Sequence, residues 1–244
     1  MISKVQIKYI RSLHQKKYRE EEGKFIAEGE KVVDELLQSN ISVFQVYATQ
    51  DWSIPAGVSA EIVSSDELKQ ISLLQSPNKV LAVAKTPQTI FEPDLFPYHL
   101  FLDEIKDPGN LGTMIRTAEW FGLKNLFCSM ESAELFNPKT VQASMGSIFR
   151  MNIHRMPFEK CVELLAPSAI YAASLAGEPL PNAPILPKSL IIIGSESHGI
   201  QTQTLAHANH LIKIPKYGAA ESLNAGIACG ILLHEFSKAL VTRS

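Results

Sequence analysis

The run of residues 107–118 is the feature that most constrains how this chain folds. An apolar stretch at 100–102 precedes it, and a helical pattern over 112–121 follows it. A Pro-Gly turn between such stretches is typical of the edge of an α/β sheet, where ligands bind. The turn presents Asn110 and, further along the helix, Arg116, a pair that suits an RNA phosphate or ribose. In the alternative interpretation, Asn110 caps the helix and Arg116 is a surface residue.

A second segment of the same kind follows a buried strand. Four consecutive apolar residues at 190–193 predict that strand. Gly194 and Gly199 then allow a sharp turn and a close approach of the backbone to a ligand. Glu196 lies in this turn, either as a functional carboxylate or as a group that caps a local amide.

A third segment runs from an apolar stretch at 211–215 into the last helical pattern of the chain. Ser222 is a good N-cap for a helix predicted over 222–240. Asn224 falls in the first turn of that helix, where its amide can face the same crevice.

With these three segments in this order, the chain resembles the SpoU (TrmH-like) family of RNA ribose 2'-O-methyltransferases, in the SPOUT superfamily. The matching segments are residues 110–118, 194–199 and 214–224. The resemblance implies an α/β fold whose C-terminal domain is a trefoil-knotted, mostly parallel sheet flanked by helices. It also implies S-adenosylmethionine bound in the knot and a homodimer. Knots are nearly absent from proteins, so the knot is an expectation from the resemblance alone.

The resemblance assigns roles to particular residues, with methyl transfer to a ribose 2'-hydroxyl of structured RNA as the activity. The catalytic set that it implies is Arg116, Asn110, Glu196, Ser222 and Asn224. The cofactor set, which acts mostly through backbone groups, is Leu175, Gly194, Ile214 and Leu223. These four would otherwise be core residues and strand ends.

The chemistry of Arg116 limits its role. A guanidinium with a pKa above about 12 does not readily act as a base. Arg116 is therefore expected to clamp a phosphate beside the target ribose, or to stabilise the alkoxide as it forms. The base is left unassigned. Ser197 and Lys216 depart from the family's pattern at the rim of the expected pocket.

Strands and helices alternate along the whole chain. Strand patterns at 25–27, 43–48, 61–63 and 80–84 predict a small α/β domain over 1–85. It resembles the substrate-binding domain, related to the L7Ae/L30e ribosomal proteins, that often precedes a SpoU domain. Three prolines mark 86–97 as a stiff linker. The methyltransferase domain is then expected at 98–244, with strands at 100–103, 125–128, 152–154 and 169–173.

The last predicted helix contains two glycines one turn apart, Gly226 and Gly230. Glycine within a helix costs about 1 kcal/mol relative to alanine, which is tolerable where another backbone packs closely. The family resemblance favours packing within the knot and the dimer, and the alternative is close packing on the protein's own sheet.

The first 19 residues are basic, with no acidic residue among them. Lys4, Lys8 and Arg11 share one helix face, which predicts contacts with RNA phosphates. The opposite face is expected to dock through Ile2, Val5, Tyr9 and Leu13. Because three glutamates follow at 20–22, a solvated helix face is the alternative.

Composition bounds the remaining choices. The net charge of -2 argues against a protein that coats nucleic acid indiscriminately. The three cysteines are widely spaced, which predicts no metal site and a reducing, cytoplasmic location. The longest apolar stretch, at 227–233, is too short to span a membrane.

Two other functions compete with methyl transfer. One is a non-catalytic RNA-binding or ribosome-assembly factor on the same fold, which the intact catalytic set argues against. The other is a dinucleotide enzyme, which is disfavoured because no G-x-G-x-x-G follows the first strand of either domain. The additional N-terminal domain favours ribosomal RNA over transfer RNA as the substrate, by analogy.

Overall fold

The structure is a computed structural model that describes residues 2–240. The chain forms two compact units. Unit 1 combines the chain up to Gln88 with Glu134–Arg150, and unit 2 combines Thr89–Ala133 with the chain from Met151 onward. The predicted boundaries at 85 and 98 stay predictions, but the segment 134–150 groups with the N-terminal part of the chain.

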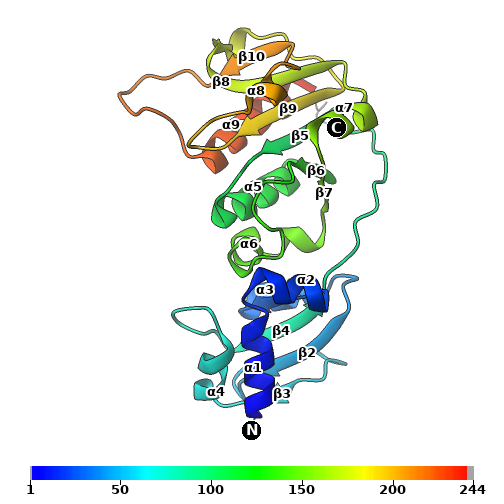
Figure 1. The fold of residues 1–244 in the computed structure, drawn as a ribbon, viewed down its shortest axis with the longest axis vertical. Coiled ribbons are helices and arrows are strands. Elements are labelled where there is room, and N and C mark those ends of the chain that lie inside the picture. Colours follow the sequence, from blue (N-terminus) through cyan, green and yellow to red (C-terminus); the bar gives the residue numbers. More distant parts are fainter. Residues whose placement is uncertain (1, 241–244) are drawn as a thin grey trace. The chain divides into compact units, whose positions relative to one another are not determined.

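Unit 1 is built on a four-stranded sheet in the order β1-β4-β2-β3 (Figure 1). Strand β4 pairs antiparallel with both β1 and β2, while the short β3 joins β2 in parallel. The strands are β1 (Lys24–Glu28), β2 (Val43–Ala48), β3 (Glu61–Ile62) and β4 (Val80–Lys85). The helices are α1 (Lys4–Ser12), α2 (Lys16–Glu22), α3 (Glu30–Leu37), α4 (Ser65–Ile71) and α6 (Pro138–Ser144), followed by the 3-10 turn η1 (Ser147–Phe149).

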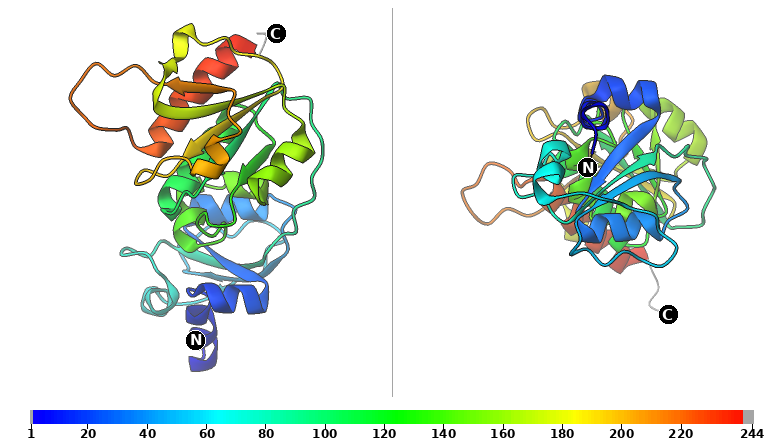
Figure 2. Two further views of the ribbon diagram at one scale, coloured as in Figure 1. Left: turned by 45° about the horizontal axis from the view of Figure 1, so that its top comes forward. Right: turned by 90° about the horizontal axis from the view of Figure 1, so that it is seen from below.

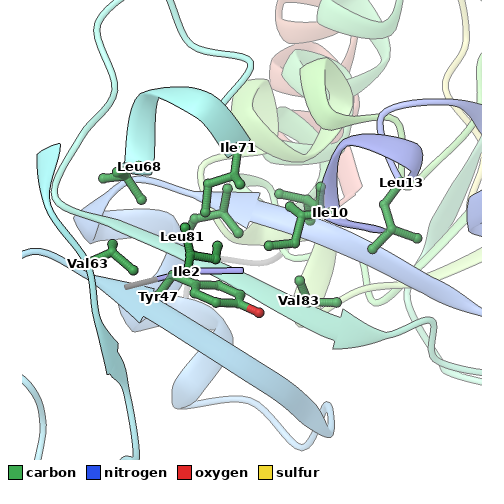
Figure 3. Close-up of a cluster of buried hydrophobic side chains, with 10 residues drawn as sticks. Ile2, Ile10, Leu13, Tyr47, Val63, Leu68, Ile71, Leu81 and Val83 are labelled. Carbon is green, nitrogen blue, oxygen red and sulfur yellow. The ribbon is translucent and has the colours of Figure 1, made fainter. Parts of the chain in front are cut away.

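Helices α1 and α4 close one face of this sheet over a compact apolar cluster (Figure 3). Ile10 of α1 is fully buried there, whereas Val5, which was predicted to dock, is 79% exposed. Positions 5 and 10 lie about 140° apart around a helix, so burying one turns the other outward. The predicted docking face is therefore wrong at Val5, while Ile2 and Leu13 are buried as predicted.

The segment 134–150 is held in unit 1 by polar and aromatic contacts. Arg19, only 3% exposed, donates from Nε to Oε1 of Glu134 at 2.8 Å. The rings of Phe25 and Phe136 lie 4.6 Å apart. A methyl group added to Gly146 would meet Glu35 Cβ at 2.6 Å. Burial of a paired arginine and this close packing account for the grouping of the segment with β1 and α3.

Unit 2 contains a six-stranded sheet in the order β10-β8-β9-β5-β6-β7, with every neighbouring pair parallel. The strands are β5 (Tyr98–Asp103), β6 (Asn125–Cys128), β7 (Asn152–Arg155), β8 (Ala169–Pro179), β9 (Ser189–Gly194) and β10 (His210–Lys213). The helices are α5 (Pro108–Trp120), α7 (Phe158–Leu165), α8 (Thr202–Leu205) and α9 (Ala225–Leu240), and a 3-10 turn η2 (Leu180–Asn182) follows β8. The predicted α/β class with a parallel sheet flanked by helices is confirmed.

Side chains of β5 alternate between the two faces of this sheet. The ring of Phe101 meets Phe158 of α7 at 4.9 Å, while Tyr98 contacts Phe236 of α9 at 5.8 Å. Helices α5 and α9 also pack together, because Gly226 brings α9 close to Thr113. Gly226 and Gly230 thus face Thr113 and Thr117 of helix α5, not the sheet that was the alternative partner, and packing within a knot or a dimer stays a prediction.

Three element boundaries in unit 2 differ from the sequence prediction by three residues or more. Helix α5 begins at Pro108 and not at Gly112, because Asp107 Oδ1 accepts from the Asn110 amide at 2.8 Å and caps the helix earlier. Helix α9 begins at Ala225, so Ser222 is not its N-cap. Strand β8 continues past Ala173 to Pro179 through a large irregularity opposite β10.

The strand order places a switch point between β5 and β9. The chain leaves β5 toward β6 and β7 on one side, and β8, β9 and β10 lie on the other. Crevices form at the carboxyl ends of parallel strands where the order reverses. The loop from β10 to α9 projects from the sheet at this edge (Figure 2).

Candidate functional site

The three sequence segments meet at the switch point of the unit 2 sheet. Asp103, at the end of β5, pairs in register with Gly194, at the end of β9. The segment after β5 carries Asn110, the segment after β9 carries Glu196, and the loop after β10 carries Asn224. Parallel strands of one sheet therefore deliver residues that are up to 114 positions apart in the sequence to one edge, although β10 is separated from β5 by β8 and β9.

Asn110 is the centre of a chain of side-chain hydrogen bonds. Asn224 donates from Nδ2 to Asn110 Oδ1 at 2.9 Å. Asn110 in turn donates from Nδ2 to the carboxylate of Glu196. Asn224 Oδ1 also accepts from the backbone amide of Gly226 at 2.9 Å. The side-chain amides of Asn110 and Asn224 thus each donate through Nδ2 and accept through Oδ1. Asn224 is the cap of α9, a role that the sequence analysis gave to Ser222.

The turn after β9 is shaped by its glycines. Ser195 and Gly199 exchange two backbone hydrogen bonds, of 3.0 and 2.9 Å, and close the loop that carries Glu196. A methyl group on Gly194 would lie 2.2 Å from the carbonyl carbon of Gly199. Gly199 has φ +69°, a conformation that favours glycine. Both glycines are therefore required by the local backbone, as the sequence predicted.

A cavity of about 610 Å³ opens beside this turn, between the ends of β8, β9 and β10. Its volume falls within the range of about 300–1,000 Å³ typical of small-molecule sites. The four residues expected to bind a cofactor all line it, together with Glu196 and Ser222. They are Leu175, Gly194, Ile214 and Leu223.

Leu175 reaches the cavity because of the irregularity in β8. On β10, Leu211 pairs with Ala172 of β8, but the next residue, Ile212, pairs with Glu178. The segment of β8 between these two partners therefore loops out of the sheet. Leu175 is 72% exposed on this loop. Gly177 fixes the end of the loop, since a Cβ there would lie 2.5 Å from the Ile212 amide nitrogen.

Arg116 lies apart from the hydrogen-bonded chain. It is exposed on α5, six residues after Asn110, which is about 9 Å along the helix axis. Within residues 2–240 its guanidinium has no hydrogen bond or ion pair. Ser222 is also exposed and lines the cavity. The structure thus joins Asn110, Glu196 and Asn224 directly, and leaves Arg116 and Ser222 as separate groups.

Comparison with known proteins assigns the family. Residues 97–234 match the SpoU rRNA Methylase family. The chain belongs to this family. It is 31% identical to the Bacillus subtilis 23S rRNA (guanosine(2553)-2'-O)-methyltransferase RlmP, over 93% of this chain and 94% of the relative. The family resemblance inferred from the three segments is confirmed.

Solved structures of SpoU and TrmH proteins match almost the whole chain. An AdoMet-bound rRNA methyltransferase from Sinorhizobium meliloti superposes with a TM-score of 0.86 at 28% identity, covering 99% of this chain and 97% of that one. A TrmH-family protein from Porphyromonas gingivalis gives a TM-score of 0.84 at 33% identity, covering 98% and 99%. Residues 4–82 match an MRM3-like substrate binding domain. The expected substrate-binding domain ahead of the SpoU domain is confirmed.

The residues predicted to bind RNA lie on α1 of unit 1. Lys4, Lys8 and Arg11 are all exposed. Ser3 caps the helix with a reciprocal pair of bonds to Gln6, which fixes where the helix begins. The contact of Lys4, Lys8 and Arg11 with RNA stays a prediction.

The cavity also contains polar and aromatic residues that the sequence analysis did not use. Lys213, Tyr217, Glu221 and His198 line it. Tyr217 is 96% exposed. His198 lies in the turn after β9, where its Nδ1 is 2.7 Å from the Ser197 hydroxyl. Their positions in the second and third segments were visible in the sequence, but which residues face the cavity depends on the loop conformations.

Two features are absent from residues 2–240. No helix in this part of the chain is long and apolar enough to cross a membrane. The same residues contain no group of three or more histidines, cysteines or acidic residues placed to hold a metal ion.

Proposed function

We propose that this SpoU-family protein transfers a methyl group from S-adenosylmethionine to a ribose 2'-hydroxyl of structured RNA, with ribosomal RNA favoured. The observation that carries the proposal is the convergence of Asn110, Glu196 and Asn224 into one hydrogen-bonded chain beside the cavity. The names of the relatives support ribosomal RNA, since the Bacillus subtilis relative is named for the 2'-O position of 23S rRNA.

The cavity fits S-adenosylmethionine in size and in chemistry. Its walls are mainly apolar side chains and the backbone of three loops, which suits an adenosine recognised through main-chain groups. Leu175, Gly194, Ile214 and Leu223 would hold the cofactor. S-adenosylmethionine supplies the methyl group when it is bound. The Sinorhizobium meliloti structure, which is AdoMet-bound, supports this choice.

Side chains of the protein position the catalytic groups and bind the RNA. Asn110 fixes the carboxylate of Glu196 at the edge of the site, and Asn224 fixes the amide of Asn110. Arg116 offers a permanent positive charge with five donors, suited to a phosphate next to the target ribose. Ser222 lines the cavity as an additional hydroxyl group. Alignment of the acceptor hydroxyl by such fixed groups is a large part of catalysis of a displacement reaction.

The deciding experiment is a map of 2'-O-methylated positions in total RNA from cells with and without the protein. The expected result is the loss of one ribose methylation in ribosomal RNA. Recovery of that methylation by the purified protein, S-adenosylmethionine and unmodified ribosomal RNA completes the test. Binding of the RNA with no methylation at any position would instead assign a non-catalytic RNA-binding factor.

Phosphate contact by α1 is part of this proposal. Lys4, Lys8 and Arg11 are exposed on one helix and add positive charge to the substrate-binding domain. Replacing all three with alanine should reduce the slope of log affinity against log salt by up to about 3 units, since each phosphate contact contributes roughly 0.7–0.9. An unchanged salt slope would show that Lys4, Lys8 and Arg11 of α1 do not contact RNA phosphates.

The proposal includes a homodimer, with the knot that the family resemblance implies. Exposed apolar residues on α9 and α5 support an interface there: Ile227 is 57% exposed and Trp120 is 85% exposed. Burying such residues is favourable. Ile227→Glu should convert the dimer to a monomer in equilibrium sedimentation, and a wild-type monomer at micromolar concentration would contradict this part.

We place the activity in the cytoplasm. The three cysteines, Cys128, Cys161 and Cys229, are buried and unpaired, as suits a reducing compartment. Burial raises the pKa of Cys128 and of Cys229 to about 12, so neither is a ready nucleophile. Cell fractionation with detection of the protein tests the location.

A further inference from the structure

We propose that a second RNA contact lies on unit 1, where Tyr9, Lys24, Phe44 and Lys85 form a surface that binds single-stranded RNA through base stacking and phosphate contacts. We call these four residues the aromatic–lysine patch. The inference rests on the proposed function only in taking RNA as the substrate. It adds a site outside the catalytic unit and outside the basic face of α1.

Phe44 is the exposed aromatic residue of this surface. It is 62% exposed, although most large apolar residues of the sheet are buried. In the pairing of β2 with β4, Val43 faces Ala84 and Gln45 faces Val83, so Phe44 is the extra residue of a β-bulge. Bulges redirect a side chain and are common next to functional sites. Here the bulge presents an aromatic ring to solvent.

Lys24 links this ring to a second one. Its ammonium lies 4.0 Å from the centre of the Phe44 ring and 5.3 Å from that of Tyr9. It also donates a hydrogen bond to the Tyr9 hydroxyl at 2.8 Å. The two rings and the cation therefore form one ordered surface, built from α1, β1 and β2.

The charges of the patch are arranged for an anion. Lys24 and Lys85 lie directly opposite each other in the antiparallel pair of β1 and β4. Like charges at such positions repel each other and weaken a sheet. The carboxylate of Glu22 accepts from the Tyr9 hydroxyl at 3.3 Å and lies 3.6 Å from the Lys24 ammonium, so it neutralises Lys24 in part. Within the part of the chain that the structure describes, Lys85 has no carboxylate partner and is the cation left for a phosphate. A phosphate between the two lysines would remove the repulsion.

A single strand of RNA combines the two features that this surface recognises. Its unstacked bases can pack on the exposed ring of Phe44, while Tyr9 is half-buried, and its phosphates suit lysines at the edge. A duplex keeps its bases stacked on each other and offers only phosphates. The patch therefore fits an unpaired segment of the RNA.

The test measures binding of an unstructured oligouridine of about 12 nucleotides to the full-length protein by fluorescence anisotropy, without cofactor. Phe44→Ala should weaken binding at least fivefold, about 1 kcal/mol. Phe44→Trp should keep wild-type affinity, because tryptophan also stacks. Lys85→Gln should reduce the salt slope by about 0.7, the value for one phosphate on a single strand. A duplex of the same length should not respond to Phe44→Ala.

Matched controls come from the same unit. Ile54 is 40% exposed beyond the other end of β2, and Lys69 is exposed on α4. Ile54→Ala and Lys69→Gln should leave the oligouridine affinity and the salt slope unchanged. Thermal unfolding of each variant checks the fold, and should Phe44→Ala fail to fold, the salt slope of Lys85→Gln decides the question.

Three results would overturn the inference: no binding of oligouridine by the wild type, wild-type binding by Phe44→Ala together with an unchanged slope for Lys85→Gln, or an equal loss in the controls. Because the assay needs no methyl transfer, it separates the two proposals. Binding that depends on the patch in a protein without activity would keep this inference and refute methyl transfer. Methyl transfer with no effect at the patch would do the reverse.

Discussion

Asn224 has two tasks, and two substitutions can separate them. Its Oδ1 caps α9 by accepting from the amides of Gly226, at 2.9 Å, and Ile227, at 3.3 Å. Its Nδ2 donates to Asn110 in the candidate site. Asn224→Ala removes both groups. Asn224→Asp keeps the capping oxygen and replaces only the donor.

The expected stabilities follow from the cap. Loss of an asparagine N-cap costs about 1 kcal/mol, with a range of roughly 0.5–2 kcal/mol. In a chain of 244 residues this lowers the melting temperature by about 2–4 °C. Asn224→Ala should show this decrease. Asn224→Asp should unfold close to the wild type, because aspartate caps as well as asparagine and its charge suits a helix N-terminus.

The expected activities are in the opposite order. With an aspartate at 224, Oδ1 of Asn110 faces a carboxylate oxygen that cannot donate to it. Turning the Asn110 amide over relieves this repulsion but takes its N–H group away from Glu196, so the link to Glu196 is lost. A hydrogen bond to a charged group contributes about 1.5–3 kcal/mol, which corresponds to a roughly 10- to 150-fold fall in kcat/KM. Asn224→Ala leaves the bond from Asn110 to Glu196 in place, so its activity should fall by only about fivefold.

The two assays are thermal unfolding and methyl transfer to the RNA substrate. We predict that the two variants rank differently in the two assays. Asn224→Ala is the less stable variant, and Asn224→Asp is the less active one. Wild-type activity of Asn224→Asp would refute the role of the hydrogen-bonded chain. An unchanged melting temperature for Asn224→Ala would refute the cap.

Three further predictions concern the same unit. Arg116→Ala should abolish methyl transfer while cofactor affinity stays within about twofold, and activity within about threefold of wild type would contradict the phosphate clamp. Gly194→Ala should lower S-adenosylmethionine affinity at least about tenfold in calorimetry, since its methyl group overlaps backbone, whereas Gly218→Ala, which meets open space in the same cavity, should not. Burial lowers the pKa of His154 and of His99, so their contribution to stability is present above about pH 6.5 and is lost as the pH falls. The stability advantage of wild type over His154→Gln in denaturant unfolding should therefore shrink from about pH 7.5 to about pH 5.5, and a constant difference would contradict it.

Local patterns in the sequence were sufficient for most elements. The strands at 43–48 and 125–128 have the predicted bounds, and α6 begins at Pro138 after the cap Asn137, a pair of residues typical of a helix start. Such features depend on side-chain period and on capping within a few residues, which the sequence displays directly. Errors occurred where neighbouring caps compete. Asp107 and Asn224 cap their helices, although Ser222 and a later start at Gly112 fitted the pattern equally well.

Long-range pairing was beyond any local pattern. No local pattern indicates that 134–150 packs with β1 and α3, because the burial of Arg19 against Glu134 joins residues 115 positions apart. Contacts within the predicted linker are also long-range: Phe91 packs on Phe127, and Asp94 accepts from Asn125 at 2.6 Å in unit 2. The exposed ring of Phe44 depends on the register of β2 against β4.

The candidate site divides in the same way. The sequence by itself determined the family, the residue types and the order of the three segments, because glycines at turns and polar residues after apolar strands are local features. Only the tertiary structure decided that Asn110 bonds to both Glu196 and Asn224, that Arg116 stays separate, and that Leu175 reaches the cavity from an irregular strand. The physical reason is that these relations depend on strand order and register, and thus on the summed packing of the whole sheet.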